Sequence, residues 1–243
     1  MQVVTLAAGL GARLGDMTKA TPKALIEVAD RPLLDYALRF AAKVGATRRL
    51  VVGGFCHEDV ATFVRGIAPE ATIIENPDYR LGNLLTLVAA LPHLQDGGFL
   101  LMNTDHIYRP TIADVVRKTI DGATSVTAIC DFDRKLTSDD MKVGLDGDRR
   151  VETMSKQLET WDCGYVGMTY VPAAKRAVYQ AAVASTREVV GEKAVVEQVL
   201  VQLATSGEPV EIADISGHGW LEIDEPHERA HAEATLEAEH WWE

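Results

Sequence analysis

The sequence predicts an α/β protein with a Rossmann-like, mostly parallel sheet that carries helices on both faces. Three observations support this prediction. Short apolar runs alternate with longer segments of helical periodicity over the first 130 residues. A glycine-rich loop follows the first apolar run, where open α/β sheets bind their ligands. The chain has 243 residues, of which 47% are apolar, and so can bury a sizeable core.

The elements of the first half follow this alternation. In the segment 32–44, apolar residues at positions 34, 37, 38, 41 and 44 form a helical stripe. Pro32 stands at its beginning and Gly45 just after its end, as in many helices. Strands are predicted at 3–7, 49–53, 72–75, 99–103 and 124–130, and helices at 32–44, 58–67, 82–94 and 110–121.

The pattern changes after residue 130. The stretch DFDRKLTSDDMKVGLDGDRRVETM is charged, and its LDGD segment predicts a hairpin turn. Beyond it we predict strands at 161–171, 209–214 and 220–223, and helices at 172–184, 194–204 and 225–242. The chain contains no internal repeat and no clear linker. We therefore expect one domain, 1–243, with halves 1–130 and 131–243.

Charge and composition exclude several functional classes. The net charge is -12, and there is no basic stripe of the kind that binds nucleic acid. The three cysteines are far apart and form neither a disulfide framework nor a metal-binding pair. The chain opens with a strand and a loop rather than a signal peptide, and no apolar segment is long enough to span a membrane. We expect a cytoplasmic protein.

The opening loop, LAAGLGARLGDMTKATPKAL, combines bare backbone with two cations. Gly9, Gly11 and Gly15 would let backbone amides approach a phosphate or a base. Arg13 and Lys23 can reach charged oxygens. A flexible glycine-rich turn is the alternative. The loop matches neither the dinucleotide fingerprint, which opens directly into a helix, nor the phosphate loop that ends in Lys-Ser or Lys-Thr.

Two aspartates follow predicted strands. Asp105 comes just after the strand 99–103, in FLLMNTDHIYRP, and Asp224 lies at a strand-to-helix junction in GWLEIDEPHERA. Carboxylates at the carboxyl ends of strands suit Mg²⁺. A helix N-cap is the alternative for both residues, and a turn is a further one for Asp105.

Longer stretches resemble a known family. The segment LAAGLGARLGDMTKATPKALIEVADRPLLDYAL is similar to the N-terminal signature of the sugar-phosphate nucleotidyltransferases. ENPDYRLGNLLTLVAAL, NTDHIY and KQLETWDCGYVGM look most like the CTP:inositol-1-phosphate cytidylyltransferases, with choline-phosphate cytidylyltransferases next. The resemblance implies a nucleotidyltransferase fold. Its first half, 1–130, would mainly bind the nucleotide, and 131–243 would mainly bind the acceptor and supply the C-terminal helix.

The resemblance also implies roles for single residues. Asp105 and Asp224 would hold Mg²⁺, with His106 beside the metal. Lys156 would meet the phosphate of the acceptor and Asp162 one of its hydroxyl groups, although a surface position is the alternative for each. Lys142 is a weaker cationic candidate. The nucleotide would be bound by Leu6, Ala7, Ala8, Gly9, Gly11, Arg13, Lys23, Gly82 and Asn83.

The predicted reaction is Mg²⁺-dependent transfer of CMP from CTP to a phosphorylated alcohol, with release of pyrophosphate. Inositol 1-phosphate is favoured as acceptor, since few aromatic residues stand near 131–165 to enclose a quaternary ammonium. Phosphocholine and hexose 1-phosphates are the alternative acceptors. A nucleotide-sensing domain without catalysis is the alternative of another class. The expected partners are CTP and the acceptor, with no nucleic acid, and a homodimer is a further expectation.

One motif points elsewhere. His227, Glu228 and His231 match H-E-x-x-H, the helical zinc motif of metallopeptidases. The extended form of that motif needs Gly at 234 and His at 237, where this chain has Ala234 and Glu237. We interpret the segment as the polar face of a terminal helix. The following pair, Trp241-Trp242, predicts packing or a dimer contact.

Overall fold

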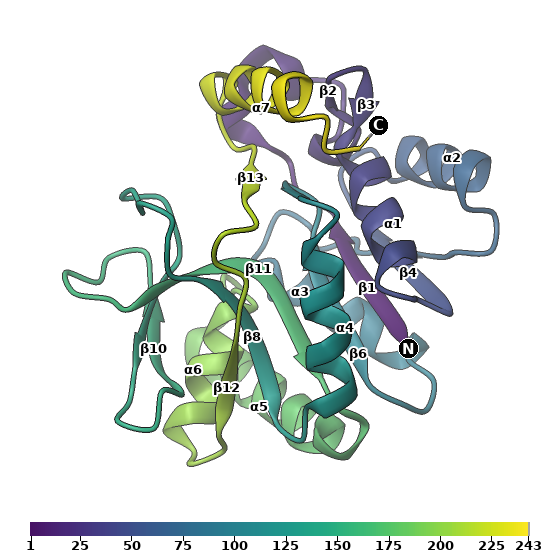
Figure 1. The fold of residues 1–243 in the computed structure, drawn as a ribbon. Helices are drawn as coiled ribbons and strands as arrows, with labels where there is room; N and C mark the ends of the chain where they lie inside the picture. The colour runs from purple at the N-terminus through teal and green to yellow at the C-terminus, as the bar shows by residue number, and fades with distance from the viewer. Residues whose placement is uncertain (243) are drawn as a thin grey trace.

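The computed structural model describes residues 1–242, which form a nine-stranded mixed sheet flanked by helices (Figure 1). Seven strands follow one another in the order β10-β9-β11-β6-β1-β4-β5, and β8 joins β11 to β12. The bounds are β1 Gln2–Ala7, β4 Arg48–Gly53, β5 Thr72–Glu75, β6 Phe99–Asn103, β8 Val126–Asp131, β9 Lys142–Leu145, β10 Val151–Ser155, β11 Cys163–Val171 and β12 Val210–Asp214.

The direction of the strands separates two parts of the sheet. Strands β6, β1, β4 and β5 are parallel, and β12 is parallel to β8. Strand β11 runs antiparallel to β6, β8 and β9, and β9 with β10 forms the predicted hairpin. The Rossmann-like prediction is confirmed, with β11 as the antiparallel link between both halves of the chain.

Both faces of the sheet are buried, as the alternation along β1 demonstrates. Val4 points into a core shared with Leu84 and Tyr179, whereas Val3 points into one shared with Phe40 and Ile112. Figure 1 shows α4 on one side of the sheet and α5 and α6 on the other. The helices are α1 Leu33–Lys43, α2 His57–Ile67, α3 Leu84–Ala90, α4 Ile112–Gly122, α5 Arg176–Val190, α6 Glu197–Thr205 and α7 Pro226–Glu239.

Some elements differ from the sequence prediction. The helix expected at 82–94 begins at Leu84 and ends at Ala90, because a 3₁₀ turn with Pro92 follows. The helix expected at 172–184 reaches Val190, beyond which Gly191 has φ 85°. Three short strands were not predicted: β2 Glu27–Val28, β3 Arg31–Pro32 and β7 His106–Tyr108. The strand expected at 220–223 is present as β13 Trp220–Glu222.

The C-terminal segment packs on its own chain. Helix α7 lies over the β2–β3 hairpin at one end of the molecule (Figure 1). Trp241 is 8% exposed, and Trp242 donates from Nε1 to the carbonyl of Tyr108 at 3.1 Å. The tryptophan pair therefore serves packing within the chain. Within residues 1–242, no helix combines the length and apolar character needed to cross a membrane.

Candidate active site

A two-stranded sheet brings the two predicted acids together. Strand β13 pairs antiparallel with β7, with Glu222 opposite His106. The next link is a hydrogen bond of 2.9 Å from the amide of Ile223 to the carbonyl of Asp105. Asp105 precedes β7 and Asp224 follows β13, so this pairing places residues separated by 119 positions in sequence side by side.

Both acids bind the same cation. Lys23 is almost fully buried, and its Nζ donates to Asp105 Oδ2 at 2.8 Å and also to Asp224 Oδ1. Burial disfavours the charged ammonium, but the two carboxylates outweigh this effect and raise the pKa of Lys23. Burial likewise opposes ionisation of Asp105, yet Lys23 and a hydrogen bond from His106 hold its pKa well below the usual value. The pKa shifts of Lys23 and Asp105 thus both favour a charged ammonium in contact with a charged carboxylate.

His106 supports this cluster from one side. Its Nδ1 lies 2.7 Å from Asp105 Oδ1, and its Nε2 lies 3.9 Å from Glu222 Oε1. The imidazole stacks between Trp220 and Tyr108, with ring centroids 5.2 and 5.8 Å away. Since the Asp105 carboxylate is ionised, the histidine Nδ1 donates to it and fixes its orientation.

A third carboxylate connects the other two predicted cations. Asp139, in the loop between β8 and β9, accepts hydrogen bonds from Arg13 and from Lys156 Nζ, the latter at 3.2 Å. Arg13 also donates to Asp224. The cation of the opening loop and the cation of the acceptor half therefore face the same space.

Arg13, Asp105 and Lys156 are among the residues that line one cleft of about 450 Å³. Lys23 and Asp139 are not part of its wall but are bonded to residues that are. Arg13, Asn83, Asp105, Lys156 and Asp224 were predicted from the sequence as site residues, and all five lie on its wall. Other parts of the wall are the side chains of Asn103, His106, Met141, Met154, Tyr165, Glu197, Gln198 and Glu222.

The opening loop is held by a glycine. Gly11 has φ 63°, and a Cβ at this position would come within 2.9 Å of Lys23 Cβ and 3.0 Å of Thr18 Cγ2. Glycine thus lets the loop close over Lys23. Gly9 is exposed, and a Cβ there would meet no atom within 4 Å. Leu6 and Ala7 form the buried end of β1 and Ala8, also buried, follows it; Thr104 Oγ1 donates to the carbonyl of Leu6 at 2.8 Å.

Comparison with known proteins identifies the family of this chain. The family model described as the MobA-like NTP transferase domain matches residues 3–198. The chain belongs to this family.

Relatives of this MobA-like domain include enzymes named for several acceptors. The chain is 26% identical over 249 residues to the CMP-5'-(3-aminopropyl)phosphonate synthase of Streptomyces rubellomurinus, covering 96% of this chain and 38% of that protein. It is 31% identical over 229 residues to the bifunctional IPC transferase and DIPP synthase of Rubrobacter xylanophilus, covering 91% and 48%. The chain thus spans less than half of the length of these curated relatives.

A solved structure has the same fold. The inositol-1-phosphate CTP transferase from T. maritima superimposes with a TM-score of 0.81 at 19% identity, over 93% of this chain and 90% of the other. The nucleotidyltransferase fold expected from the sequence is therefore confirmed.

The loop at residues 82–83 has a packing role in this MobA-like domain. The amide of Gly82 donates to the carbonyl of Glu192 at 2.7 Å, and a Cβ on Gly82 would lie 1.9 Å from the carbonyl oxygen of Ala194. Asn83 Oδ1 accepts from the amide of Val196 at 2.9 Å. Asn83 reaches the cleft, whereas Gly82 lies against the backbone that leads into α6.

The predicted residues Asp162 and Lys142 of the second half also lie outside the cleft wall. Asp162 accepts a hydrogen bond of 2.8 Å from the amide of Leu145, in the manner of the surface turn that was its alternative. Lys142 is buried, and its Nζ donates to the carbonyl of Lys156 at 2.7 Å. Lys142 therefore supports the backbone of Lys156 rather than facing a ligand.

The H-E-x-x-H segment has a capping role. Glu228 Oε2 accepts from the amides of Asp224 and Glu225, at 2.7 and 2.9 Å, and completes a capping box at the start of α7. Glu225 is the N-cap, so the N-cap alternative for Asp224 is wrong. The carboxylate of Glu228 is bonded to backbone amides, while His227 is 75% exposed. These contacts fit the polar helix rather than a zinc peptidase.

A divalent cation fits the two aspartates. Asp105 and Asp224 already share one cation, the ammonium of Lys23. Among residues 1–242, no three His, Cys, Asp or Glu side chains gather as a complete metal cage. Mg²⁺ needs only one or two carboxylates when substrate phosphates and water complete its shell. The donor set therefore suits a cation that arrives with a triphosphate.

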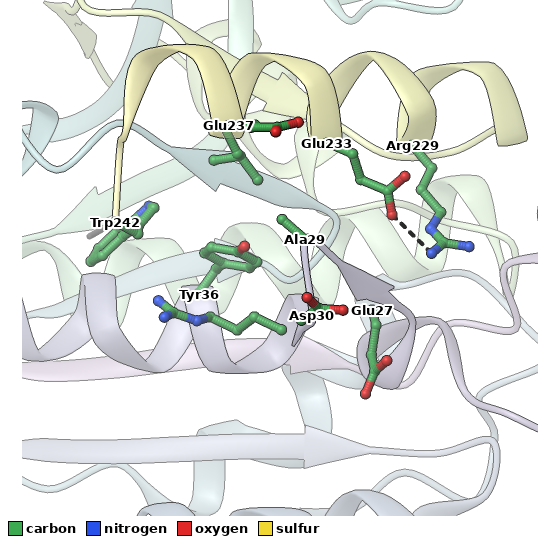
Figure 2. A pocket seen from close by; sticks show the side chains of 10 residues that line it. Glu27, Ala29, Asp30, Tyr36, Arg229, Glu233, Glu237 and Trp242 are labelled. Carbon is green, nitrogen blue, oxygen red and sulfur yellow. Dashed lines mark ion pairs between the residues drawn. The ribbon is translucent and has the colours of Figure 1, made fainter.

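A second hollow, of about 520 Å³, lies between α7, α1 and the β2–β3 hairpin (Figure 2). Its wall contains four acids, Glu27, Asp30, Glu233 and Glu237. Arg229 forms an ion pair of 2.8 Å with Glu233 there. None of the predicted site residues lines this hollow. The predicted site residues Arg13, Asn83, Asp105, Lys156 and Asp224 line the cleft at Asp105 instead.

Proposed function

We propose that this protein is a nucleotidyltransferase that transfers CMP from CTP to a phosphorylated alcohol or a phosphonate. Arg13, Asp105 and Asp224 line one cleft, and the buried Lys23 bonds to both acids; this cluster carries the proposal. Acids and cations in this arrangement suit a metal-bound triphosphate. Membership of the MobA-like family supports the same reaction class.

The chemistry is a direct displacement. An oxygen of the acceptor's phosphate forms a bond to the α-phosphorus, and the bond from this phosphorus to the bridging oxygen breaks, releasing pyrophosphate. Lys23 stabilises the charge that develops on the α-phosphate, and Arg13 binds the β- and γ-phosphates. The acceptor oxygen is already ionised, so no general base has to remove a proton. The protein contributes by positioning and by neutralising charge.

Asp105 and Asp224 would hold Mg²⁺ in this reaction. When bound, the metal offsets the repulsion between two multiply charged anions and orients the triphosphate. Lys23 then exchanges part of its contact with the acids for contact with phosphate. His106 keeps the Asp105 carboxylate oriented during this exchange.

The acceptor is bound in the second half of the chain. Lys156 lines the same cleft as Arg13 and binds the acceptor's phosphate or phosphonate. Inositol 1-phosphate is the acceptor that the sequence resemblance favours, and a relative named for an aminopropylphosphonate product supports a second class. A single domain, a homodimer and a cytoplasmic location remain predictions.

Pyrophosphate release tests the proposed function. Purified protein is incubated with Mg²⁺ and each of CTP, UTP, GTP, ATP and dTTP against phosphorylated polyols, phosphocholine, aminoalkylphosphonates and hexose 1-phosphates. We expect release with CTP and one acceptor class. Asp105→Asn should reduce kcat by on the order of 10²–10³.

The matched control is Asp114→Asn, an exposed acid on α4 that pairs with Arg117 at the surface. This variant should keep full activity. If the wild-type protein releases no pyrophosphate with any combination of the panel, a nucleotide-sensing domain would be favoured. Full activity of Asp105→Asn would remove the metal role from that residue.

A further inference from the structure

Glu197 is a buried carboxylate on the wall of the active-site cleft. It is the first residue of α6, and only 9% of its surface is exposed. Its side chain makes no hydrogen bond or ion pair with any other residue of the described chain and accepts only from its own backbone amide. The three other acids of the cleft wall, Asp105, Asp224 and Glu222, all have cationic or imidazole partners. Glu197 is the acid without one.

An ionised carboxylate in this position costs stability. Burial raises the pKa of Glu197, and the charge of Asp105 acts in the same direction. Lys156 attracts Glu197 across the cleft, but the Lys156 ammonium is bonded to Asp139. A partner that arrives with the substrate would compensate this cost.

Helix stabilisation does not account for the burial. An acid in the first turn of α6 interacts favourably with the helix dipole, but an exposed glutamate gains the same benefit without losing water. The neighbouring positions Val196, Val199 and Leu200 are apolar and buried, so a nonpolar side chain would suit this segment better. The interaction that favours a carboxylate at this position must therefore be with a group in the cleft.

We infer that Glu197 binds a cationic ammonium group at the end of the acceptor remote from its phosphate. This inference rests on the proposed function. The acceptor would be a zwitterion, an alkyl phosphate or phosphonate with an amino or methylated ammonium terminus. Lys156 holds its anionic end and Glu197 its cationic end. Met141, Met154 and Tyr165 line the same cleft and offer apolar surface to the carbon chain.

A pair of isosteric acceptors tests the charge directly. Phosphocholine and 3,3-dimethylbutyl phosphate have the same shape, but only the former carries a positive charge. We expect wild-type kcat/KM to be at least about 30-fold higher for phosphocholine, the effect of one desolvated charge pair. 2-Aminoethylphosphonate and phosphoethanolamine should also exceed inositol 1-phosphate.

Glu197→Gln then identifies the residue responsible. This variant should lose the preference between the two isosteres and leave the KM for CTP unchanged. Glu188→Gln, an exposed acid on α5, serves as the matched control and should behave like the wild type. Equal use of the two isosteres by the wild type, or better use of inositol 1-phosphate, would overturn the inference while the proposed function stands.

Binding separates failure of the inference from failure of the proposed function. The two isosteres are titrated into wild-type protein with CTP and Mg²⁺ present, and the melting temperature is recorded. If no acceptor releases pyrophosphate, the proposed function falls. If, in addition, phosphocholine and its uncharged isostere raise the melting temperature equally, the assignment of Glu197 is also wrong. Stronger stabilisation by phosphocholine, absent in Glu197→Gln, supports the ammonium site.

Discussion

At the scale of single residues, Glu197 predicts an unusual dependence of stability on pH. Burial raises the pKa of its carboxyl above the unfolded value of about 4.3. The folded state therefore binds this proton more tightly, and the stabilisation is present at low pH and lost as pH rises through the two pKa values. Glu197→Gln should melt at a higher temperature than wild type at pH 8.

The difference in melting temperature should shrink as the pH is lowered toward 4.5, where the wild-type carboxyl takes up its proton. Calorimetry over this range measures it, with the exposed acid variant Glu192→Gln as control. If Glu197→Gln stabilises the fold but loses the acceptor preference, Glu197 serves ligand binding at a cost in stability. A constant difference at all pH values would contradict the argument.

Removal of the Asp139 carboxylate should strengthen the binding of both substrates. This carboxylate bridges Arg13 and Lys156, the cations assigned to the triphosphate and to the acceptor. Asp139→Asn frees both cations, so KM for both substrates should fall, by up to about 5-fold because exposed ion pairs are weak. Steady-state kinetics measures this change. Asp133→Asn, an exposed acid of the same loop, should leave both KM values unchanged, and a higher KM in Asp139→Asn would show that Asp139 itself helps to bind substrate.

At the scale of elements, the start of α7 controls the position of Asp224. Glu228 binds the amides of Asp224 and Glu225. Glu228→Ala should lower the free energy of unfolding by about 1 kcal/mol, as for loss of a helix cap, and should also reduce kcat because Asp224 loses its fixed backbone. Denaturant unfolding and turnover are both measured. Glu237→Ala, on an exposed position of the same helix, is the control, and normal turnover in Glu228→Ala would contradict the link.

The elements that assemble the site were predictable only in part. Strand β13 falls within the strand predicted at 220–223, but β7 has only three residues, too short for an alternating pattern to develop, and was missed. Their pairing joins segments that are far apart in sequence, so Asp105 and Asp224 were predicted as ligands without the contact that unites them. The opening loop was easier to predict, because Gly11, Arg13 and Lys23 lie within one short stretch of sequence.

Glu197 and Asp139 were missed for different reasons. Glu197 stands in AVVEQVLV, and a charge within an apolar run on a predicted helix was the signal available. Asp139 lies in the acidic loop TSDDM, where nothing distinguishes it from its neighbour Asp140. Only the fold shows that Asp139 faces two cations, whereas Asp140 caps its own loop through Thr137.

At the scale of the whole molecule, nucleotide binding should stabilise the fold through the metal. A ligand at 100 times its Kd adds about 2.7 kcal/mol, which for a chain of this size raises Tm by about 5–10 °C. We expect this shift with CTP and Mg²⁺ and a much smaller one when EDTA removes the metal. Asp105→Asn should also lose most of it. An equal shift with and without EDTA would indicate a nucleotide bound without metal.

Attempts to exchange the acceptor by grafting a related loop have to keep glycine at position 82. Any side chain there would collide with the carbonyl of Ala194 and push the start of α6 away from the sheet. Glu197 would move with it, and the transplanted loop would fail for steric reasons that say nothing about its chemistry. Libraries for altered substrate choice are therefore better directed at Met141, Met154 and Gln198 than at this junction.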